Sequence, residues 1–295
     1  MAIIKPVDES LIRIDALPAF DPVHRVAVSM LRLDRMHPFI SGNKWYKLSL
    51  NLQTALDAGY RRLLTFGGAY SNHLIAAAAA AQTNDLQITG VVRGAEFAHR
   101  LNPVLQACAD MGMQLAFVSR EEYDLREKSA AVTNLLHNTY LIPEGGANEA
   151  GRKGAGQIAS LIPGSFSHIC VSVGSGTTFE GLRNALPASQ RLMGYVPIKG
   201  GRYLETSVRS HLDAPDRDNW QLSDAWAMGG FGKCPPELNA WMQSFNDQYG
   251  IELDRVYTAK MMFGLQAELT QGAFPVNARI LCIHTGGLTG NVSNI

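Results

Sequence analysis

The stretch "RRLLTFGGAYSNHLIAAAAAA", residues 61–81, decides the fold class. A short apolar run ends in Gly67-Gly68, and Ser71-Asn72 then opens an alanine-rich segment of helical length. The same order of strand, glycine turn and helix recurs in "HICVSVGSGTTFEGL", residues 168–182. Because strands that alternate with helices at this spacing form parallel sheets with right-handed crossovers, the sequence predicts an α/β protein.

The alternation extends along most of the chain. Strands are predicted at 61–66, 86–93, 113–119, 139–143, 168–174, 191–198 and 279–285. Helices are predicted at 44–58, 72–83, 100–111, 120–136, 147–162, 177–186, 235–249 and 257–271. Glycine clusters near 56–60 and 143–151 mark two breaks. They predict a small inserted α/β domain at 57–143 and a large domain formed by 1–56 and 144–295.

Composition excludes several classes of protein. The 295 residues carry a formal net charge of zero, 46% are hydrophobic and 18% are charged, as in a globular protein with a substantial core. No basic stripe indicates nucleic-acid binding, and no apolar run approaches a membrane span. The N-terminus lacks a signal-peptide core, which favours a cytoplasmic protein. The four cysteines fit neither zinc nor disulfide spacing, so no metal site is predicted and buried small side chains are the simplest interpretation.

The segment "ISGNKWYKLSLNLQTAL", residues 40–56, places Lys44 and Lys47 at the start of a predicted helix. Helix starts favour acidic residues, because the helix dipole is positive there. Either the two lysines are solvated surface residues, or an anionic or covalently bound group lies beside them.

Two strand-to-helix junctions offer anion sites. At Ser71-Asn72-His73 the helix start is either a plain capped helix or a site for a substrate carboxylate. The turn at residues 174–178, "GSGTT", is either a simple tight turn or a cup for a phosphate monoester. It is no P-loop, because no Gly-Lys-Ser/Thr follows, and Phe179 replaces the third glycine of a dinucleotide fingerprint.

Three predicted features would together serve a cofactor that has a phosphate and an aldehyde. They are the phosphate cup, the anion-binding helix start and the lysine at a positive helix end. A lysine beside a phosphate-anchored aldehyde can bond to it covalently, which is the logic of pyridoxal-phosphate enzymes. The positive helix end would lower the proton affinity of Lys44, and this bond requires the neutral amine. Lys47, one turn further along, could direct its charge at the cofactor phosphate.

The motifs "SGNKWYKL", "GGAYSNH", "GSGTT", "VYTAKMM" and "HTGG" together resemble those of the D-cysteine desulfhydrase and 1-aminocyclopropane-1-carboxylate (ACC) deaminase family. The resemblance runs from about residue 30 to residue 288. It implies the fold-type II architecture of the tryptophan synthase β subunit, with two three-layer parallel-sheet domains and the active site in the cleft between them. It also implies a homodimer.

The resemblance implies that pyridoxal 5'-phosphate is held by residues that match the family's cofactor positions: Lys44, Lys47, Asn72, Ser175, Gly176, Thr177, Thr178 and Thr258. It implies catalytic roles for Lys44, Ser71 and Tyr257. The substrate, a small amino acid, would contact Ser71, Asn72, His73, Phe231 and Tyr257. Lys44 matches the lysine that bonds to the cofactor, and Thr258 matches the position that contacts the pyridine nitrogen.

Two positions bear on the substrate. ACC deaminases resemble one another in having Glu where this chain has Thr258, and a neutral hydroxyl supports a weaker electron sink than a carboxylate does. Phe231 stands where the family usually has a second tyrosine, which removes one donor for the carboxylate or one proton relay for either substrate and argues further against an ACC deaminase, where two tyrosines are expected. The resemblance therefore favours β-elimination from D-cysteine to give pyruvate, hydrogen sulfide and ammonia. Alternatives are an ACC deaminase, a D-serine-type dehydratase or a phosphate-ligand binding protein without catalysis. This chain lacks the complete glycine fingerprint and the ribose-binding acid of a nicotinamide dehydrogenase, which argues against that class of enzyme.

Overall fold

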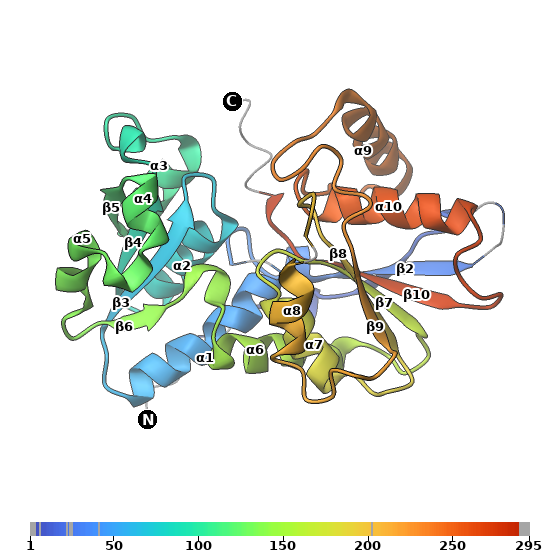
Figure 1. Cartoon of the computed structure of the whole chain (residues 1–295), viewed down its shortest axis with the longest axis horizontal. Helices are drawn as coiled ribbons and strands as arrows, with labels where there is room; N and C mark the ends of the chain where they lie inside the picture. Colours follow the sequence, from blue (N-terminus) through green and yellow to red (C-terminus); the bar gives the residue numbers. More distant parts are fainter. Residues whose placement is uncertain are drawn as a thin grey trace.

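Two β-sheets organise the chain in the computed structural model, which describes residues 4–5, 7–21, 23, 26–40, 42–201 and 203–288 (Figure 1). The smaller sheet has the order β5-β4-β3-β6 and is parallel throughout. Its strands are β3 (Arg62–Gly68), β4 (Gln87–Arg93), β5 (Gln114–Val118) and β6 (Tyr140–Ile142).

The larger sheet has the order β1-β2-β10-β7-β8-β9 and is parallel except where β1 joins β2. Its strands are β1 (Ile14–Ala16), β2 (Ala27–Arg32), β7 (His168–Ser172), β8 (Arg191–Tyr195), β9 (Trp220–Ser223) and β10 (Arg279–His284).

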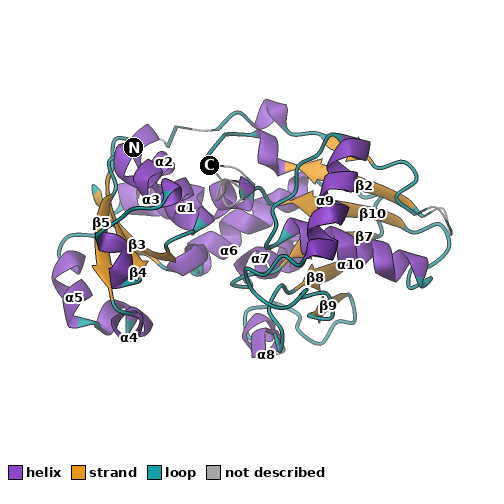
Figure 2. Cartoon of the chain, turned by 90° about the horizontal axis from the view of Figure 1, so that it is seen from above, coloured by secondary structure: helices purple, strands orange, loops and turns teal. Residues whose placement is uncertain are grey.

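Helices flank both sheets. They are α1 (Asn43–Asp57), α2 (Asn72–Thr83), α3 (Pro103–Asp110), α4 (Arg120–Asp124), α5 (Ala130–Thr133), α6 (Glu149–Gly156), α7 (Thr177–Ala185), α8 (Tyr203–Arg209), α9 (Pro236–Tyr249) and α10 (Thr258–Thr270). In Figure 2, α1 and α6 lie between the two sheets. Within the described residues, none of these helices is both long and apolar enough to cross a membrane.

Helix α2 shows why the sequence folds in this way. Its six consecutive alanines, 76–81, are all buried, and they let the helix pack closely on β3 and β4. Helix α1 is buried through Trp45, Tyr46, Leu48 and Leu52 and packs against both α2 and α6. The helix that carries the two lysines is therefore fixed between the two halves of the molecule, the smaller half built on the four-stranded sheet and the larger half on the six-stranded sheet.

The predicted α/β class and parallel sheets are confirmed, and each predicted strand is present. The sequence pattern does not predict β1, β2, β9 or α8. Strands β1 and β9 are short edge strands, and Ser29 interrupts the apolar run of β2. The continuous helix predicted at 120–136 is wrong, because Arg126 has a φ of 53° and Ser129 is extended, which breaks the segment into short turns. The smaller sheet takes its strands from residues 62–142, and the domain boundaries stay a prediction.

Candidate active site

A cavity of about 910 Å³ lies where the carboxyl ends of strands from both sheets meet. Its wall is formed by the segments that follow β3, β7 and β10, by Arg93 at the end of β4, and by the starts of α1, α2, α7 and α10. Ligands in open α/β folds bind at such strand ends. The predicted site residues that line this cavity are Lys44, Lys47, Ser71, Asn72, His73, Ser175, Gly176, Thr178, Phe231 and Tyr257. Thr177 and Thr258 are buried beside it and do not line it.

The turn between β7 and α7 has the geometry of an anion site. Gly176 has a φ of +87° and is the N-cap of α7, where it offers no side chain to satisfy the first N–H groups of the helix. A Cβ at Gly176 would meet the Glu180 carboxylate at 2.9 Å, but that group is the end of a flexible side chain, so glycine is favoured here chiefly by the positive φ. Ser175 Oγ lies 2.9 Å from Thr177 Oγ1. Free N–H groups and hydroxyls at a helix start suit a phosphate.

The two lysines of α1 lie in an environment that disfavours their charged forms. Burial lowers the pKa of Lys44 to about 8, although the Asp254 carboxylate partly opposes this. Burial and the charge of Lys44 hold the pKa of Lys47 well below its usual range. Lys47 Nζ donates to the Gly145 carbonyl at 3.0 Å. A neutral Lys44 amine is therefore accessible near physiological pH, as covalent bonding to an aldehyde requires.

Asn43 connects the lysine to the anion site and was not predicted. The Lys44 ammonium donates to Asn43 Oδ1 at 2.8 Å, while Asn43 Nδ2 donates to Thr178 Oγ1 at 2.8 Å. Because the Thr178 oxygen accepts this bond, its own proton can be donated to a ligand in the turn. The only signal for Asn43 in the sequence is its position directly before Lys44.

The start of α2 forms the opposite wall. Ser71 Oγ caps the helix by accepting from His73 N at 3.2 Å and from Leu74 N at 3.3 Å, which leaves its own proton to donate. Burial, followed by the charges of Lys47 and Lys44, lowers the pKa of His73 to about 3, so its ring is neutral. Thr65 donates to the Ile142 carbonyl, so Thr65 Oγ1 accepts from His73 Nε2 at 2.8 Å. His73 Nδ1 is then a buried acceptor, and no described residue donates to it.

Tyr257 and Phe231 meet on the wall formed by the larger half. Their rings are 5.9 Å apart in an edge-to-face arrangement. Burial raises the pKa of Tyr257, so its hydroxyl stays protonated. Lys260, on the same helix as Tyr257, donates from Nζ to the carbonyls of Ala227 and Gly230 at 2.8 and 2.6 Å, and so fixes the loop that carries Phe231.

At the start of α10 the structure presents Asp254 to the cavity instead of Thr258. Thr258 Oγ1 accepts from Asp254 N at 2.8 Å and donates to the Asp254 carbonyl at 3.3 Å. Asp254 Oδ1 accepts from Val256 N and Tyr257 N, whereas Oδ2 is buried and has no hydrogen-bond partner among the described residues. Burial raises the pKa of Asp254 to about 6. A contact between Thr258 and the pyridine nitrogen stays a prediction, and its hydroxyl already has two backbone partners.

Thr285 belongs to the "HTGG" motif, but the sequence predicted no role for it in the site. It follows β10 directly, is buried, and lines the cavity. The preceding His284 donates from Nε2 to the Glu252 carbonyl and accepts from Gly286 N at Nδ1, which shapes the turn. The rule that ligands bind at carboxyl strand ends could have identified Thr285. Asp254 could have been recognised as an acid three residues before a helix-opening tyrosine.

These residues fit pyridoxal phosphate. The β7–α7 turn with Lys47 provides a phosphate site, and Lys44 provides an amine that is readily deprotonated. Asp254 Oδ2 is buried and has no partner within the part of the chain that the structure describes, which fits a polar ligand completing the site. Glycine at position 287 keeps the space beside the Asn72 amide open, because a Cβ there would lie 2.7 Å from Asn72 Nδ2.

Comparison with known proteins identifies the family. Residues 14–286 match the family of pyridoxal-phosphate dependent enzymes, and the chain belongs to this family. It is a pyridoxal-phosphate dependent enzyme of fold type II.

Similar proteins show to which group within this family the chain belongs. A Pyrococcus horikoshii protein provisionally named as a 1-aminocyclopropane-1-carboxylate deaminase is 30% identical over 85% of this chain and 81% of that protein. A Klebsiella pneumoniae D-cysteine desulfhydrase is 28% identical over 84% of this chain and 83% of that protein. A crystal structure described as an ACC deaminase homologue has a TM-score of 0.82 at 26% identity, over 97% of this chain and 93% of that chain. The predicted resemblance is thus confirmed, and the chain lies in the ACC deaminase and D-cysteine desulfhydrase group.

Proposed function

We propose that this enzyme is a lyase that removes the α-proton and the β-substituent of a small amino acid, with D-cysteine as the leading substrate. The observation that carries the proposal is the placement of Lys44 in one cavity with the anion site of α7 and the capped start of α2. The reaction converts D-cysteine and water into pyruvate, hydrogen sulfide and ammonia. When bound, pyridoxal phosphate supplies an electron sink that makes the α-hydrogen acidic.

The residues of the chain then have separate tasks. The N–H groups at the start of α7, the hydroxyls of its turn and Lys47 hold the phosphate. Ser71 and the N–H groups at the start of α2 bind the α-carboxylate. Lys44 takes the α-proton, because burial keeps part of its amine neutral near pH 8. The Tyr257 hydroxyl, protonated over this pH range, donates to the departing group.

Two features of the site favour elimination from D-cysteine over ring opening of ACC. Position 258 has a neutral hydroxyl that is bound to the Asp254 backbone. Phe231 offers the cavity a ring without the hydroxyl that a tyrosine would have. Hydrosulfide is a good leaving group, so its departure depends less on an acidic side chain than the breaking of a carbon–carbon bond does.

Sulfide release tests the substrate. The purified enzyme, loaded with pyridoxal phosphate, is incubated separately with D-cysteine and L-cysteine, and sulfide, pyruvate and ammonia are measured. We expect all three products from D-cysteine, in equal amounts. Absence of sulfide from D-cysteine would refute the proposed substrate.

ACC deamination is the second candidate, because relatives and a structural neighbour carry that name. Release of ammonia from ACC without sulfide from D-cysteine would favour it. Ammonia from D-serine alone would favour a dehydratase. Membership of an enzyme family argues against a binding protein without catalysis. A homodimer and a cytoplasmic location stay predictions from the sequence.

A further inference from the structure

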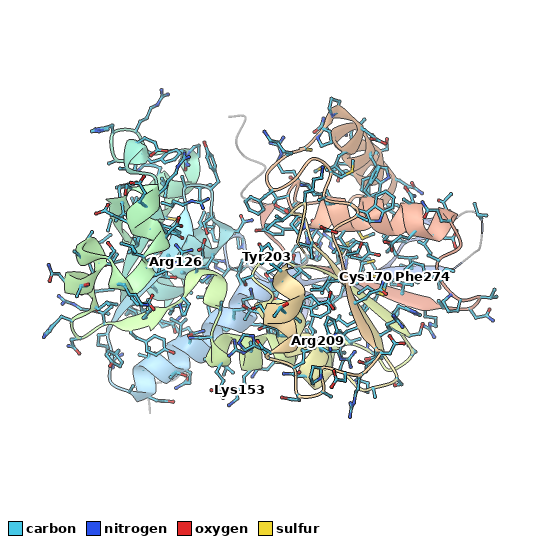
Figure 3. The ribbon with its side chains drawn as sticks, viewed as in Figure 1. Arg126, Lys153, Cys170, Tyr203, Arg209 and Phe274 are labelled. Carbon is cyan, nitrogen blue, oxygen red and sulfur yellow. The ribbon has the colours of Figure 1, made fainter. Side chains whose placement is uncertain are left out.

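Three exposed aromatic side chains lie on the wall of the active-site cavity. Tyr70, Tyr203 and Phe231 are 55%, 61% and 55% exposed, and all three line the cavity. They come from the turn after β3, the start of α8 and the loop between β9 and α9. Figure 3 places Tyr203 at the upper end of α8, near the middle of the molecule. Exposed aromatic side chains that gather around a cavity indicate contact with a ligand.

This aromatic rim is held in place by the fold. Met228, Gly229, Gly230 and Gly232 all have positive φ, and the buried Lys260 ammonium binds two carbonyls of this coiled loop. These two hydrogen bonds compensate for the burial of the ammonium, and they hold the loop in its coiled shape. Tyr70 packs edge-to-face on Phe97 at 6.2 Å, and Phe231 packs on Tyr257 in the same manner.

The cavity is larger than D-cysteine requires. Cofactor and cysteine together have roughly 22 non-hydrogen atoms, which occupy about 660 Å³ even at about 30 Å³ each, the volume of a liquid water. The cavity measures about 910 Å³. The remainder is enough for an aromatic ring, and Tyr203 and Phe231 are the surfaces against which such a ring would pack.

We infer that the preferred substrate carries an apolar, planar substituent on its sulfur, as an S-aryl or S-benzyl cysteine does. The inference rests on the proposed β-elimination. The α-C–H and β-C–S bonds break, the sulfur leaves with the bonding electron pair and takes up a proton, and water supplies the oxygen of the oxo acid. S-phenylcysteine and water thus give thiophenol, pyruvate and ammonia, with no oxidant or reductant.

Arg93 and Arg255 also line the cavity, so the competing hypothesis is a substrate whose sulfur carries a negatively charged substituent. The aromatic rim contributes three rings from three segments, and dispersion and ring stacking on these surfaces need an apolar partner. A charged substituent of similar length, such as S-carboxymethyl, separates the two possibilities.

The first experiment measures binding. The cofactor-loaded enzyme is titrated calorimetrically with 3-(phenylthio)propanoate, 3-mercaptopropanoate and 3-(carboxymethylthio)propanoate, none of which has an amino group to react. We expect the phenylthio compound to bind at least tenfold more tightly than either other compound, which is about 1.4 kcal/mol. Equal affinities, or tightest binding of the carboxymethyl compound, would overturn the inference.

The second experiment measures the ratio of kcat/KM for S-phenyl-D-cysteine to that for D-cysteine, by pyruvate formation. We expect a ratio above one, reduced about tenfold in Phe231→Ala and in Tyr203→Ala, which is about 1.4 kcal/mol. Leu125→Ala, which removes an equally exposed apolar side chain away from the cavity, is the matched control and should keep the wild-type ratio.

The outcomes distinguish the two hypotheses. If neither substrate gives pyruvate, the proposed function fails, and the binding titration still tests the aromatic rim. If D-cysteine reacts and the ratio is one or less, the inference fails and the proposed function stands. If the rim serves only to close the two halves or to contact a second copy, both rim variants will leave the ratio unchanged, and this too would overturn the inference.

Discussion

Replacing Lys44 with methionine should change how the stability of the cofactor-free protein depends on pH. In the folded chain burial lowers the pKa of Lys44 to about 8, from the usual value of 10.5. Between those two pH values the unfolded chain holds a proton that the folded chain has lost, so raising the pH favours the folded state. The penalty for charging Lys44 is present in full below about pH 8 and is gone above about pH 10.5. Lys44→Met lacks this group, so its stability should not show the same rise.

The magnitude follows from the gap between the two pKa values, which is about 2.5. At about 1.36 kcal/mol for each pKa unit, the full effect is about 3.4 kcal/mol. Lys44 is only partly buried, and water in the cavity screens its charge, so we expect about 1 to 3 kcal/mol. The bond from Lys44 Nζ to Asn43 Oδ1 is lost in the variant at every pH, and therefore shifts the stability difference without changing its slope.

The assay is urea unfolding, followed by tryptophan fluorescence, of cofactor-free wild type and Lys44→Met from about pH 7.5 to about pH 10.5. The stability of wild type relative to the variant should rise by about 1 to 3 kcal/mol over this range. Lys128→Met, which removes an exposed lysine, controls for the loss of one positive charge. A stability difference that is constant over the pH range would refute the assignment of Lys44 as a readily deprotonated amine. Saturating pyridoxal phosphate should stabilise wild type more than Lys44→Met.

Three further substitutions test the site. Asn43→Ala removes hydrogen bonds to Lys44 and to the phosphate-binding turn, and should weaken pyridoxal phosphate binding by about 10- to 100-fold in an absorbance titration. Asp254→Asn keeps an oxygen to cap α10 but removes the negative charge that raises the pKa of Lys44. The Lys44 amine should then lose its proton at a lower pH, so the pH midpoint for cofactor uptake should move downward. An upward movement would contradict this account. Gly42→Ala places a Cβ 1.9 Å from a carbonyl oxygen at a φ of +67° and should lower unfolding stability by about 2 to 4 kcal/mol. Gly59→Ala, with a φ of +81° in open space, should cost less in the same thermal-unfolding measurement.

The sequence predicted the elements that carry the site, because each has a strong local signal. Gly176 marks a turn that needs positive φ, and Ser71 marks a helix cap whose side chain accepts from the next N–H groups. The sequence did not predict Asn43 or Asp254 as site residues. Asn43 acquires its role from a contact with Thr178, 135 residues away, and no local pattern records such a contact. From the sequence, Asp254 resembles an ordinary acid near a helix start, and only the fold shows that one of its oxygens is buried with no partner among the described residues.

By itself, the sequence determined the α/β class, the glycine turns and the family, since these depend on hydrophobic periodicity, local backbone requirements and short motifs. Only the tertiary structure decided the electrostatics. Lys44 and Lys47 would have ordinary proton affinities in an isolated helix. They become weak bases because two sheets remove them from water and place them near one another. The aromatic rim is likewise a property of the fold, because Tyr70, Tyr203 and Phe231 share a cavity only when the two halves meet.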